Sequence, residues 1–298
     1  MNALVTATSD VGLARAYAVC QQMARTHYEN FPVASLLLPR PMRPAIAAIY
    51  AFARRADDFA DEGSRSDAER LRLLDDWRRR LHGCHSGLQP ASTEDDLIFL
   101  ALGDSIRSHR LPLPLFDDLL SAFRQDVTVK RYSTWEDVLD YCARSANPVG
   151  RLVLRVAGYD EPSLDRASDA LCSALQLTNF WQDFARDWAN GRLYVPLADR
   201  DRAGARDADL DDGIVTAQWR TALRTVSSRT RRLFDQGRPV CDGVSGRLKL
   251  ELRLTWLGGS RILDRLEASD FDVFRHRPAL KAADVAPLLW RAATWKAA

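Results

Sequence analysis

The sequence lacks the features that mark secreted, membrane-spanning or nucleic-acid-binding proteins. Its five cysteines are scattered with no CxxC pair, which indicates neither a disulfide framework nor a zinc site and favours a reducing cytoplasm. No apolar run approaches the roughly 20 residues that span a bilayer, and the first residues lack a signal-peptide pattern. The 42 basic and 40 acidic side chains leave a net charge of +2 with no basic run, so nucleic acid is not expected as a partner. We expect a cytoplasmic protein, at most peripheral to a membrane.

Alternating strand patterns are also almost absent, apart from VTVKRY at 127–132. Apolar residues make up 46% of the chain and recur with helical period instead. The expected helices cover, approximately, residues 10–27, 44–62, 66–83, 94–109, 113–126, 134–146, 149–158, 163–189, 213–236, 243–268 and 284–297. No repeat of a solenoid is present. The sequence therefore predicts one all-α domain over residues 1–298.

Local signals set several of these boundaries. Pro44 suits the first turn of a helix, and Ser133 with Glu136 forms a capping-box pattern ahead of residues 134–146. The stretch DRDRAGARDADLDDG at 199–213 is charged and poor in apolar residues. We expect it to form a surface loop that is too short for an interdomain linker.

Two acidic motifs stand out from this helical background. In AIYAFARRADDFADE, a helical wheel places Asp57 and Asp61 (the first motif) in one narrow stripe with Tyr50 and Arg54, opposite an apolar face. Carboxylates one turn apart repel each other by about 0.2–0.5 kcal/mol even when exposed. Partial burial raises that cost unless a cation lies between them.

The second motif comprises Asn179, Asp183 and Asp187 in LTNFWQDFARDW. Its members share a stripe with Gln176 and lie beside a wide aromatic face. Hard cations such as Mg²⁺ accept a few carboxylates and keep substrate phosphates as further ligands. Acidic pairs at this spacing are also common on solvated helix faces, and that alternative stays open for either motif alone. The apolar helices and the neutral polar partners in both stripes favour opposite walls of one cavity that holds a diphosphate through metal ions.

The two motifs together resemble those of the squalene/phytoene synthase family, the head-to-head prenyl-diphosphate synthases. DDFAD matches the family's DxxxD, and the second motif matches its NxxxD with a further aspartate. The lead-in is similar to AIYxxxRxxDD and carries over Tyr50 and Arg54. Tyr141 in DYCARSANPVG matches the tyrosine of YCxxVAGxVG, QLTNFWQD carries over Gln176, and GRLYVP resembles (G/E)RxYxP.

The resemblance covers about residues 12–270 and implies a single-domain, all-α isoprenoid (class I terpene) synthase fold with a central cavity between helices. It implies an isoprenoid diphosphate substrate and Mg²⁺, with Mn²⁺ as a substitute. The implied metal ligands are Asp57, Asp61, Asn179, Asp183 and Asp187. Arg54 and Gln176 are implied to contact the diphosphate, and Tyr50 and Tyr141 to line the reacting end. The four aspartates and two tyrosines form the expected catalytic set.

This chain departs from the family pattern in several segments, which read FWQ inside the second motif, HYENF at 27–31, SANPVG at 145–150 and TWLGGSRILD at 255–264. Together these variants resemble one branch, the bacterial hydroxysqualene synthases of hopanoid-associated squalene biosynthesis. That branch implies ionisation of presqualene diphosphate, rearrangement, and a water quench to hydroxysqualene. It implies no NADPH. It also implies coupling to a presqualene diphosphate synthase and a flavin-dependent hydroxysqualene reductase, in the bacterial cytoplasm or at the inner membrane.

Weaker candidates complete the expected site. Asn147 and Tyr28 are polar residues that could hold the quenching water, and His27 is a further candidate for binding the substrate. Arg277 in FRHRP is a candidate cap for the diphosphate, with a solvated basic turn as the alternative.

Aromatic side chains could stabilise a carbocation by about 0.5–2 kcal/mol each, but core packing is the better expectation for the four candidates Phe31, Phe52, Trp181 and Phe184. The C-terminal segment could contact a membrane through Trp290 and Trp295, although packing on the domain is again favoured.

Three other functions stay open. The first is condensation of two farnesyl or geranylgeranyl diphosphates to presqualene diphosphate, squalene or phytoene. The second is a head-to-tail prenyltransferase or terpene cyclase, since DDFAD also spells DDxxD, although the second motif disfavours it. The third is an assembly or scaffold protein on the same fold, which the complete set of ligands disfavours.

Overall fold

The computed structural model describes residues 2–26, 38–84 and 92–296. In these ranges the all-α prediction is confirmed, because the one strand-type pairing is an isolated parallel bridge between Arg131 and Leu193. The alternating pattern at 127–132 does not form a strand, since a helix runs to Thr128 and an irregular segment follows it. Among these residues no helix combines the length and apolarity that crossing a bilayer requires.

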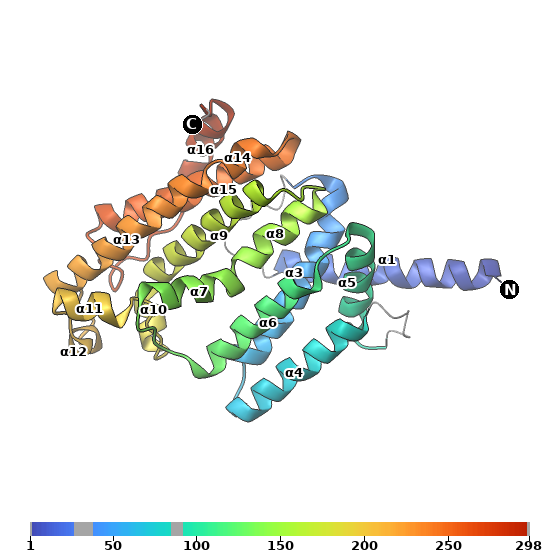
Figure 1. Ribbon diagram of the computed structural model, residues 1–298, viewed down its shortest axis with the longest axis horizontal. Helices are drawn as coiled ribbons and strands as arrows, with labels where there is room; N and C mark the ends of the chain where they lie inside the picture. The colour runs from blue at the N-terminus through green and yellow to red at the C-terminus, as the bar shows by residue number, and fades with distance from the viewer. Residues whose placement is uncertain (1, 27–37, 85–91, 297–298) are drawn as a thin grey trace. The chain divides into compact units, whose positions relative to one another are not determined.

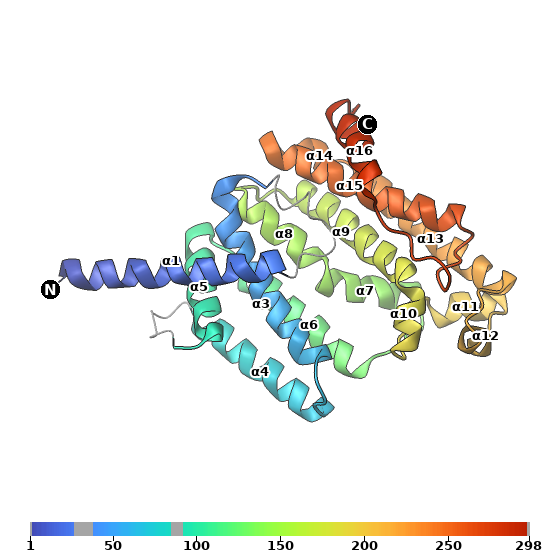
Figure 2. The same cartoon turned by 180° about the vertical axis from the view of Figure 1, so that it is seen from behind.

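The chain divides into two compact units, and each is described by itself. Unit 1 combines Met1–Thr128 with Arg151–Asp160, and unit 2 combines Val129–Gly150 with Glu161–Ala298. Unit 1 contains α1 (Asn2–Thr26), η1 (Arg40–Met42), α3 (Arg43–Asp61), α4 (Asp67–Gly83), α5 (Glu94–His109), α6 (Leu113–Thr128) and the later part of α8 (Asn147–Val156). Helix α3 contacts α1, α4, α5 and α6, as Figures 1 and 2 show.

An aromatic cluster fills the centre of unit 1. Phe52 of α3 is fully buried, and its ring stacks on Trp77 at 5.8 Å and meets the edge of Phe116 at 5.5 Å. The indole N–H of Trp77 donates to the backbone carbonyl of Phe52 over 3.3 Å. Phe52 is therefore a core residue, and the expectation of core packing is confirmed for it.

Unit 2 is built around a long helix, α9, which contacts α7, α10, α13, α14 and α15. Its helices are α7 (Trp135–Ser145), the start of α8, α9 (Pro162–Gln182), α10 (Phe184–Ala189), α11 (Leu197–Ala203), α12 (Asp207–Asp211), α13 (Ala217–Gly237), α14 (Val240–Gly243), α15 (Gly246–Ala268) and α16 (Ala282–Ala293). Both ribbon views show α9, α13 and α15 side by side (Figures 1 and 2).

Most of the predicted helices are present, with local corrections at their ends. Pro44 lies in the first turn of α3, as expected. The capping box of α7 is formed by Thr134 and Asp137 rather than Ser133 and Glu136. The side chain of Thr134 accepts from the Asp137 N–H at 3.2 Å, and the Asp137 carboxylate accepts from the Thr134 N–H at 2.8 Å. The prediction was one residue out of register.

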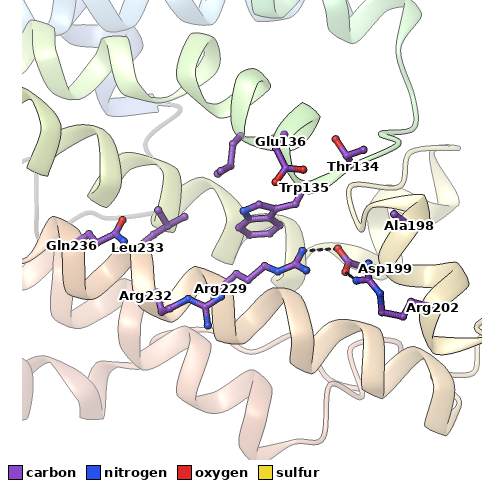
Figure 3. Close-up of a pocket in the computed structure, with 11 residues that line it drawn as sticks. Thr134, Trp135, Glu136, Ala198, Asp199, Arg202, Arg229, Arg232, Leu233 and Gln236 are labelled. Atoms are coloured by element: carbon purple, nitrogen blue, oxygen red, sulfur yellow. Dashed lines mark hydrogen bonds and ion pairs between the residues drawn. The ribbon is translucent and has the colours of Figure 1, made fainter.

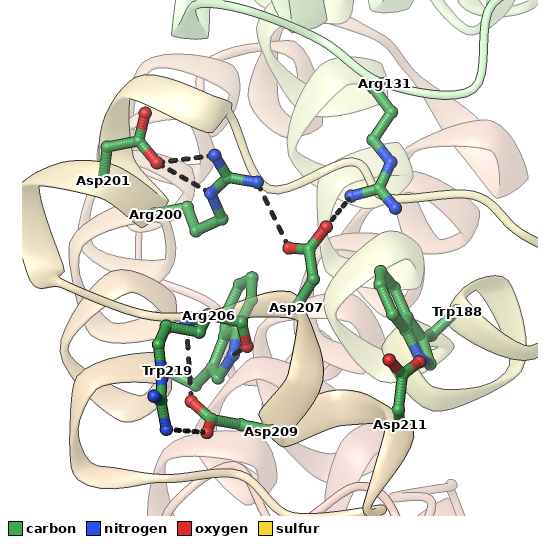
Figure 4. A network of polar contacts seen from close by, with 9 residues as sticks. All are labelled: Arg131, Trp188, Arg200, Asp201, Arg206, Asp207, Asp209, Asp211 and Trp219. Carbon is green, nitrogen blue, oxygen red and sulfur yellow. Dashed lines mark hydrogen bonds and ion pairs between the residues drawn. The ribbon is translucent and has the colours of Figure 1, made fainter.

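The predicted surface loop at 199–213 is a folded segment that contains α11 and α12. Leu210 is 1% exposed, and α11 packs against α13. Figure 4 shows the ionic network that holds this segment, in which Asp207 accepts from Arg131 at 2.9 Å and from Arg200 at 3.2 Å. The loop prediction failed because the charges of this segment pair with one another and with Arg131, while Ala205 and Leu210 are buried.

Close approach of helices in unit 2 depends on glycine. A Cβ atom placed on Gly237, the last residue of α13, would lie 2.6 Å from the backbone nitrogen and 2.8 Å from the Cα of Leu171 on α9. Backbone atoms cannot move aside as a flexible side chain does. The contact between α9 and α13 therefore requires glycine at this position.

We predict that Gly237→Ala lowers the free energy of unfolding by about 1–3 kcal/mol, the usual cost of overpacking. Gly12→Ala is the matched control, because a Cβ at Gly12 on α1 meets nothing within 4 Å and alanine favours a helix. Urea unfolding followed by circular dichroism measures both. A Gly237→Ala protein as stable as wild type would contradict the predicted steric conflict.

Candidate functional site

The first motif lies at the C-terminal end of α3, next to a guanidinium with several anionic partners. Arg54 pairs with Asp58 at 2.8 Å, with Glu62 at 2.8 Å and with Asp57 at 3.5 Å. Burial by itself lowers the pKa of Arg54, but the attraction of these carboxylates outweighs it and the pKa is raised. The carboxylate of Asp57 remains 41% exposed, so it is accessible to a ligand from solvent.

A second arginine fixes the helix end that carries Asp61. Arg70 of α4 donates from its guanidinium to the carbonyl oxygens of Ala60 at 2.7 Å and Gly63 at 2.8 Å. These bonds satisfy carbonyls at the end of α3 that have no partner within the helix. The helix that carries both Asp61 and Tyr50 is therefore fixed within unit 1. Asp61 is its exposed last residue, and Tyr50 is half-buried.

The second motif lies at a break between two helices of unit 2. The predicted continuous helix at 163–189 is wrong, because α9 ends at Gln182 and α10 begins at Phe184. Asp183 lies between them with φ −97° and ψ 8°, in a sparsely populated backbone region where active-site residues are often found. Its N–H still donates to the Asn179 carbonyl at 2.8 Å, and the Asp187 N–H donates to the Asp183 carbonyl at 2.8 Å. The break therefore reorients the chain locally without separating the members of the motif.

The carboxylate of Asp183 accepts several charged or polar donors. The amide of Asn179 donates to Oδ2 at 2.9 Å. Arg277 binds through two nitrogens, its Nη2 donating to Oδ2 at 3.0 Å and its Nε to Oδ1. These hydrogen bonds raise the pKa of Arg277 above its ordinary value. A second link between the same segments runs from the side-chain amide of Gln182 to the carbonyl of Pro278.

Sequence reasoning selected Arg277 but missed its partner. The expected role was a diphosphate cap, whereas the structure places the guanidinium on Asp183, 94 residues earlier in the chain. No local spacing signals such a pair. A guanidinium bound in this way balances the charge of a half-buried carboxylate through two charge-assisted hydrogen bonds.

Tyr141 of α7 joins an aromatic cluster that includes the variant segment of the second motif. It is 4% exposed, and its ring lies 6.0 Å from Phe180 and 6.1 Å from Tyr194. Phe180 and Tyr194 stack at 3.6 Å with nearly parallel planes. The FWQ and RLYVP segments are therefore in direct contact within unit 2, with Tyr141 beside them.

The remaining aromatic candidates of this motif belong to the core. Trp181 is 1% exposed, and its indole N–H donates to Thr230 at 2.9 Å. Phe184 is 3% exposed and packs on Trp219 with ring centres 5.4 Å apart. The expectation of core packing is confirmed for both. Phe31 lies outside the described residues, as do His27 and Tyr28.

Asn147, the first residue of α8, is anchored on α9. Its side-chain oxygen accepts from the hydroxyl of Ser173 at 2.9 Å. The two helices approach closely here, because a Cβ on Gly150 would lie 2.3 Å from Ser168 Oγ. Gln176 follows Ser173 by three residues and precedes Asn179 by three, so all three share one side of α9. Asn147 is thereby linked to the helix face that leads to the second motif.

The C-terminal departure from the family pattern has a packing explanation. A Cβ on Gly259 of α15 would lie 2.4 Å from Leu175 and 2.9 Å from Phe234. Gly258 beside it is buried as well. There is therefore no space for a side chain at Gly259 unless Leu175 and Phe234 move.

The side chains of the two motifs form a donor set of oxygen atoms. Four carboxylates and one amide oxygen are the hard oxygen ligands that this ion prefers, and the bond from Arg277 shows that the Asp183 carboxylate accepts a cation. Within the described part of the chain, no group of three or more His, Cys, Asp or Glu side chains is arranged to hold a metal ion. The chemistry of the donors fits the ion.

A pocket of about 570 Å³ opens in unit 2 at a different place (Figure 3). Trp135, Asp199 and Arg229 lie at its centre, where Arg229 bonds Asp199 at 2.7 Å and covers the Trp135 ring at 5.2 Å. None of the predicted site residues lines it. Three arginines line this pocket, and no motif in the sequence distinguishes them from other charged residues on helices.

The sequence model of the squalene/phytoene synthase family matches residues 24–284. The chain is 39% identical over 209 residues to a hydroxysqualene synthase of Zymomonas mobilis subsp. mobilis, covering 69% of this chain and 67% of the relative. It is 36% identical over 249 residues to a hydroxysqualene synthase of Rhodopseudomonas palustris, covering 83% and 82%. A 15-cis-phytoene synthase of Synechococcus elongatus is 31% identical over 277 residues, with 89% and 88% covered.

Solved structures agree with the sequence comparison. Squalene synthase HpnC from Alicyclobacillus acidocaldarius superposes with a TM-score of 0.80 at 39% identity, over 88% of this chain and 96% of that one. A dehydrosqualene synthase with a bound ligand gives 0.82 at 20% identity, over 95% and 97%, a likeness of fold alone. The predicted isoprenoid synthase fold is confirmed. The chain belongs to the squalene/phytoene synthase family, whose members are prenyl-diphosphate-processing enzymes.

Proposed function

We propose that this enzyme ionises presqualene diphosphate, rearranges the resulting cation and quenches it with water to give hydroxysqualene and diphosphate. One observation carries the proposal. Both acidic motifs are complete in a chain that is 36% and 39% identical to two hydroxysqualene synthases. The reaction balances without a reductant, since water supplies the hydroxyl group and a proton is released. No NADPH is therefore expected.

The side chains of both motifs are proposed to hold the diphosphate end of the substrate. Asp57, Asp61, Asn179, Asp183 and Asp187 would bind Mg²⁺, or Mn²⁺ in its place. The bound ion would supply positive charge that stabilises the departing diphosphate. Arg54 is proposed to contact the same group, because it is a partly buried guanidinium with a raised pKa. Gln176 lies one turn before the second motif and is proposed to orient the diphosphate.

Arg277 is proposed to serve two partners in turn. It neutralises Asp183 in the structure, and a bound diphosphate offers the same guanidinium a second set of anionic oxygens. His27 remains a proposed contact of the substrate. Tyr50 and Tyr141 are proposed to line the reacting end, where their rings can stabilise positive charge.

The water that ends the reaction is proposed to be held by Asn147 or Tyr28. Asn147 has the clearer structural support, because Ser173 fixes its side-chain oxygen at 2.9 Å. In an amide held by its oxygen, the N–H₂ group points away from that bond and can hold a water molecule.

A second candidate is the condensation of two farnesyl or geranylgeranyl diphosphates. It is favoured by the 31% identity to a 15-cis-phytoene synthase over 89% of this chain. A scaffold function on this fold is a third candidate, which the complete acidic motifs disfavour. We further propose a single functional domain, coupling to enzymes that make presqualene diphosphate and reduce hydroxysqualene, and a place in the bacterial cytoplasm at the inner membrane.

We predict that presqualene diphosphate with Mg²⁺ and without NADPH yields hydroxysqualene, and that the product carries the label when the reaction runs in heavy-oxygen water. Mass spectrometry identifies the product and the label. Farnesyl diphosphate supplied alone is the parallel reaction. Presqualene diphosphate accumulating from farnesyl diphosphate, or phytoene formed when geranylgeranyl diphosphate is supplied in a third reaction, would contradict the proposal and favour the condensation.

We predict that Asp183→Asn lowers turnover at least about 100-fold, as loss of one preorganised charge-stabilising group commonly does. Asn has the same shape, so the fold should remain intact. The control is Asp140→Asn, which removes a 68% exposed carboxylate paired with Arg144 one turn away. Thermal stabilisation by Mg²⁺ with a diphosphate analogue gives a second readout, and we expect only Asp183→Asn to lose it. Wild-type turnover in Asp183→Asn would refute the assigned role.

We predict that Asn147→Ala lowers the yield of the alcohol relative to products formed by proton loss, because the quenching water is no longer held. Ser173→Ala tests the anchor separately and should give a smaller shift of the same kind. Product ratios are measured by mass spectrometry after complete conversion. An unchanged proportion of alcohol in Asn147→Ala would exclude this residue as the water site.

A further inference from the structure

Helix α16 is apolar on both of its sides. Leu288 and Ala292 are buried on the inner side. Trp290 on the outer side is 71% exposed, and Leu289 and Val285 are 38% and 37% exposed. Ala286, Pro287 and Ala293 are exposed between them. A helix that is apolar all round is normally buried or in contact with lipid.

The start of α16 is held firmly on unit 2. Asp284 accepts from Arg265 of α15 at 2.7 Å and from the backbone N–H of Lys281 at 2.6 Å. The hydrogen bond from the Lys281 N–H, together with the Arg265 guanidinium, outweighs the cost of burial and keeps the pKa of Asp284 below its usual range. Asp284 is 8% exposed, so its charge is compensated inside the structure and does not reach the outer surface.

The residues after α16 are equally fixed. Trp295 meets the Trp256 ring edge at 5.3 Å and donates to Asp242 at 3.2 Å. Arg238 covers the Trp295 ring at 4.5 Å, and Arg253 donates to the carbonyl of Ala292 at 3.3 Å. The expectation that this segment packs on the domain is therefore confirmed for Trp295. It does not hold for Trp290, which points away from this packing.

The exposed charges on this segment are all of one sign. Lys281, Arg291 and Lys296 are exposed, and among residues 281–296 the one acidic side chain is the buried Asp284. The exposed surface of residues 281–296 thus combines a tryptophan, aliphatic side chains and three cations, of which Arg291 lies in α16 and the two lysines flank it. This composition is typical of helices that lie in the interface of an anionic bilayer, where Trp prefers the headgroup level and Lys and Arg attract acidic lipids.

We propose that the outer face of α16, defined by Val285, Ala286, Leu289, Trp290 and Ala293, docks on the surface of an anionic lipid bilayer. The helix is about 18 Å long and would lie in the plane of the interface. Trp290 and Leu289 enter the boundary between headgroups and acyl chains. Lys281, Arg291 and Lys296 bind lipid phosphates at its edges.

This surface gives the proposed membrane-peripheral location a physical basis, and to that extent the inference rests on the proposed function. A water-insoluble isoprenoid product has to pass from the enzyme to a lipid phase. An enzyme held at the bilayer shortens that transfer. The surface itself is defined by the contacts and exposures of α16 alone, so its binding to lipid can be measured without any turnover.

The experiment is flotation of the full chain with vesicles made of equal parts phosphatidylcholine and phosphatidylglycerol. We expect wild type to float with these vesicles and much less with pure phosphatidylcholine. Trp290→Ser with Leu289→Ser should lower the bound fraction about tenfold or more, because two apolar side chains no longer leave water. The matched control is Ile214→Ser, which removes a 53% exposed aliphatic side chain elsewhere in unit 2.

Further measurements make the result decisive. Lys281→Glu with Arg291→Glu should reduce binding to the acidic vesicles, and brominated lipids should quench tryptophan fluorescence in wild type more than in the double serine variant. Turnover on detergent-solubilised substrate should be the same in wild type and the serine variant, so failure of docking is distinguishable from failure of the proposed reaction.

Equal flotation of wild type and the serine variant would overturn the proposal. So would a wild-type dimer that the serine substitutions convert to monomer in light scattering, since a second copy would then cover this face.

Discussion

Carboxylates held one helical turn apart on partly buried helix faces need positive charge close to them, and much of the described structure meets this need. Arg54 lies among the carboxylates at the end of α3, and Arg277 comes from a distant segment to bind Asp183 with two nitrogens. Without such partners the repulsion would destabilise both helices. The same surplus of negative charge makes each motif receptive to a divalent cation.

The sequence predicted the elements that depend on local periodicity. Helices such as α4, α5 and α13 were located within a few residues because their apolar side chains recur on one face. The family resemblance rested on residue types at fixed spacing, such as Asp57 with Asp61. Spacing in the sequence predicts which side chains are neighbours in space as long as the helix that carries them is regular.

What the sequence could not predict depends on contacts between distant segments or on single-residue geometry. The break at Asp183 leaves the spacing of the second motif unchanged, so periodicity alone shows one helix. The folded segment at 199–213 looks like a loop because its buried residue, Leu210, is surrounded by charges whose partners lie in other segments, as Arg131 does for Asp207. The bond between Arg277 and Asp183 has no signal in either local sequence. Exposure of Trp290 and packing of half-buried Trp295, five residues apart, likewise follow from tertiary contacts.

The attachment of Arg277 to Asp183 has a consequence for how the C-terminal part of the chain can change in evolution. Substitution of Arg277 leaves a half-buried carboxylate without its partner, so the FRHRP turn is bound to the second motif and can vary only together with it. The outer positions of α16 follow only a few residues later and have no such partner within the fold. Two adjoining stretches should therefore diverge at different rates among relatives. The turn should change slowly and in step with α9, and the outer face of α16 should change with the surroundings in which each enzyme works.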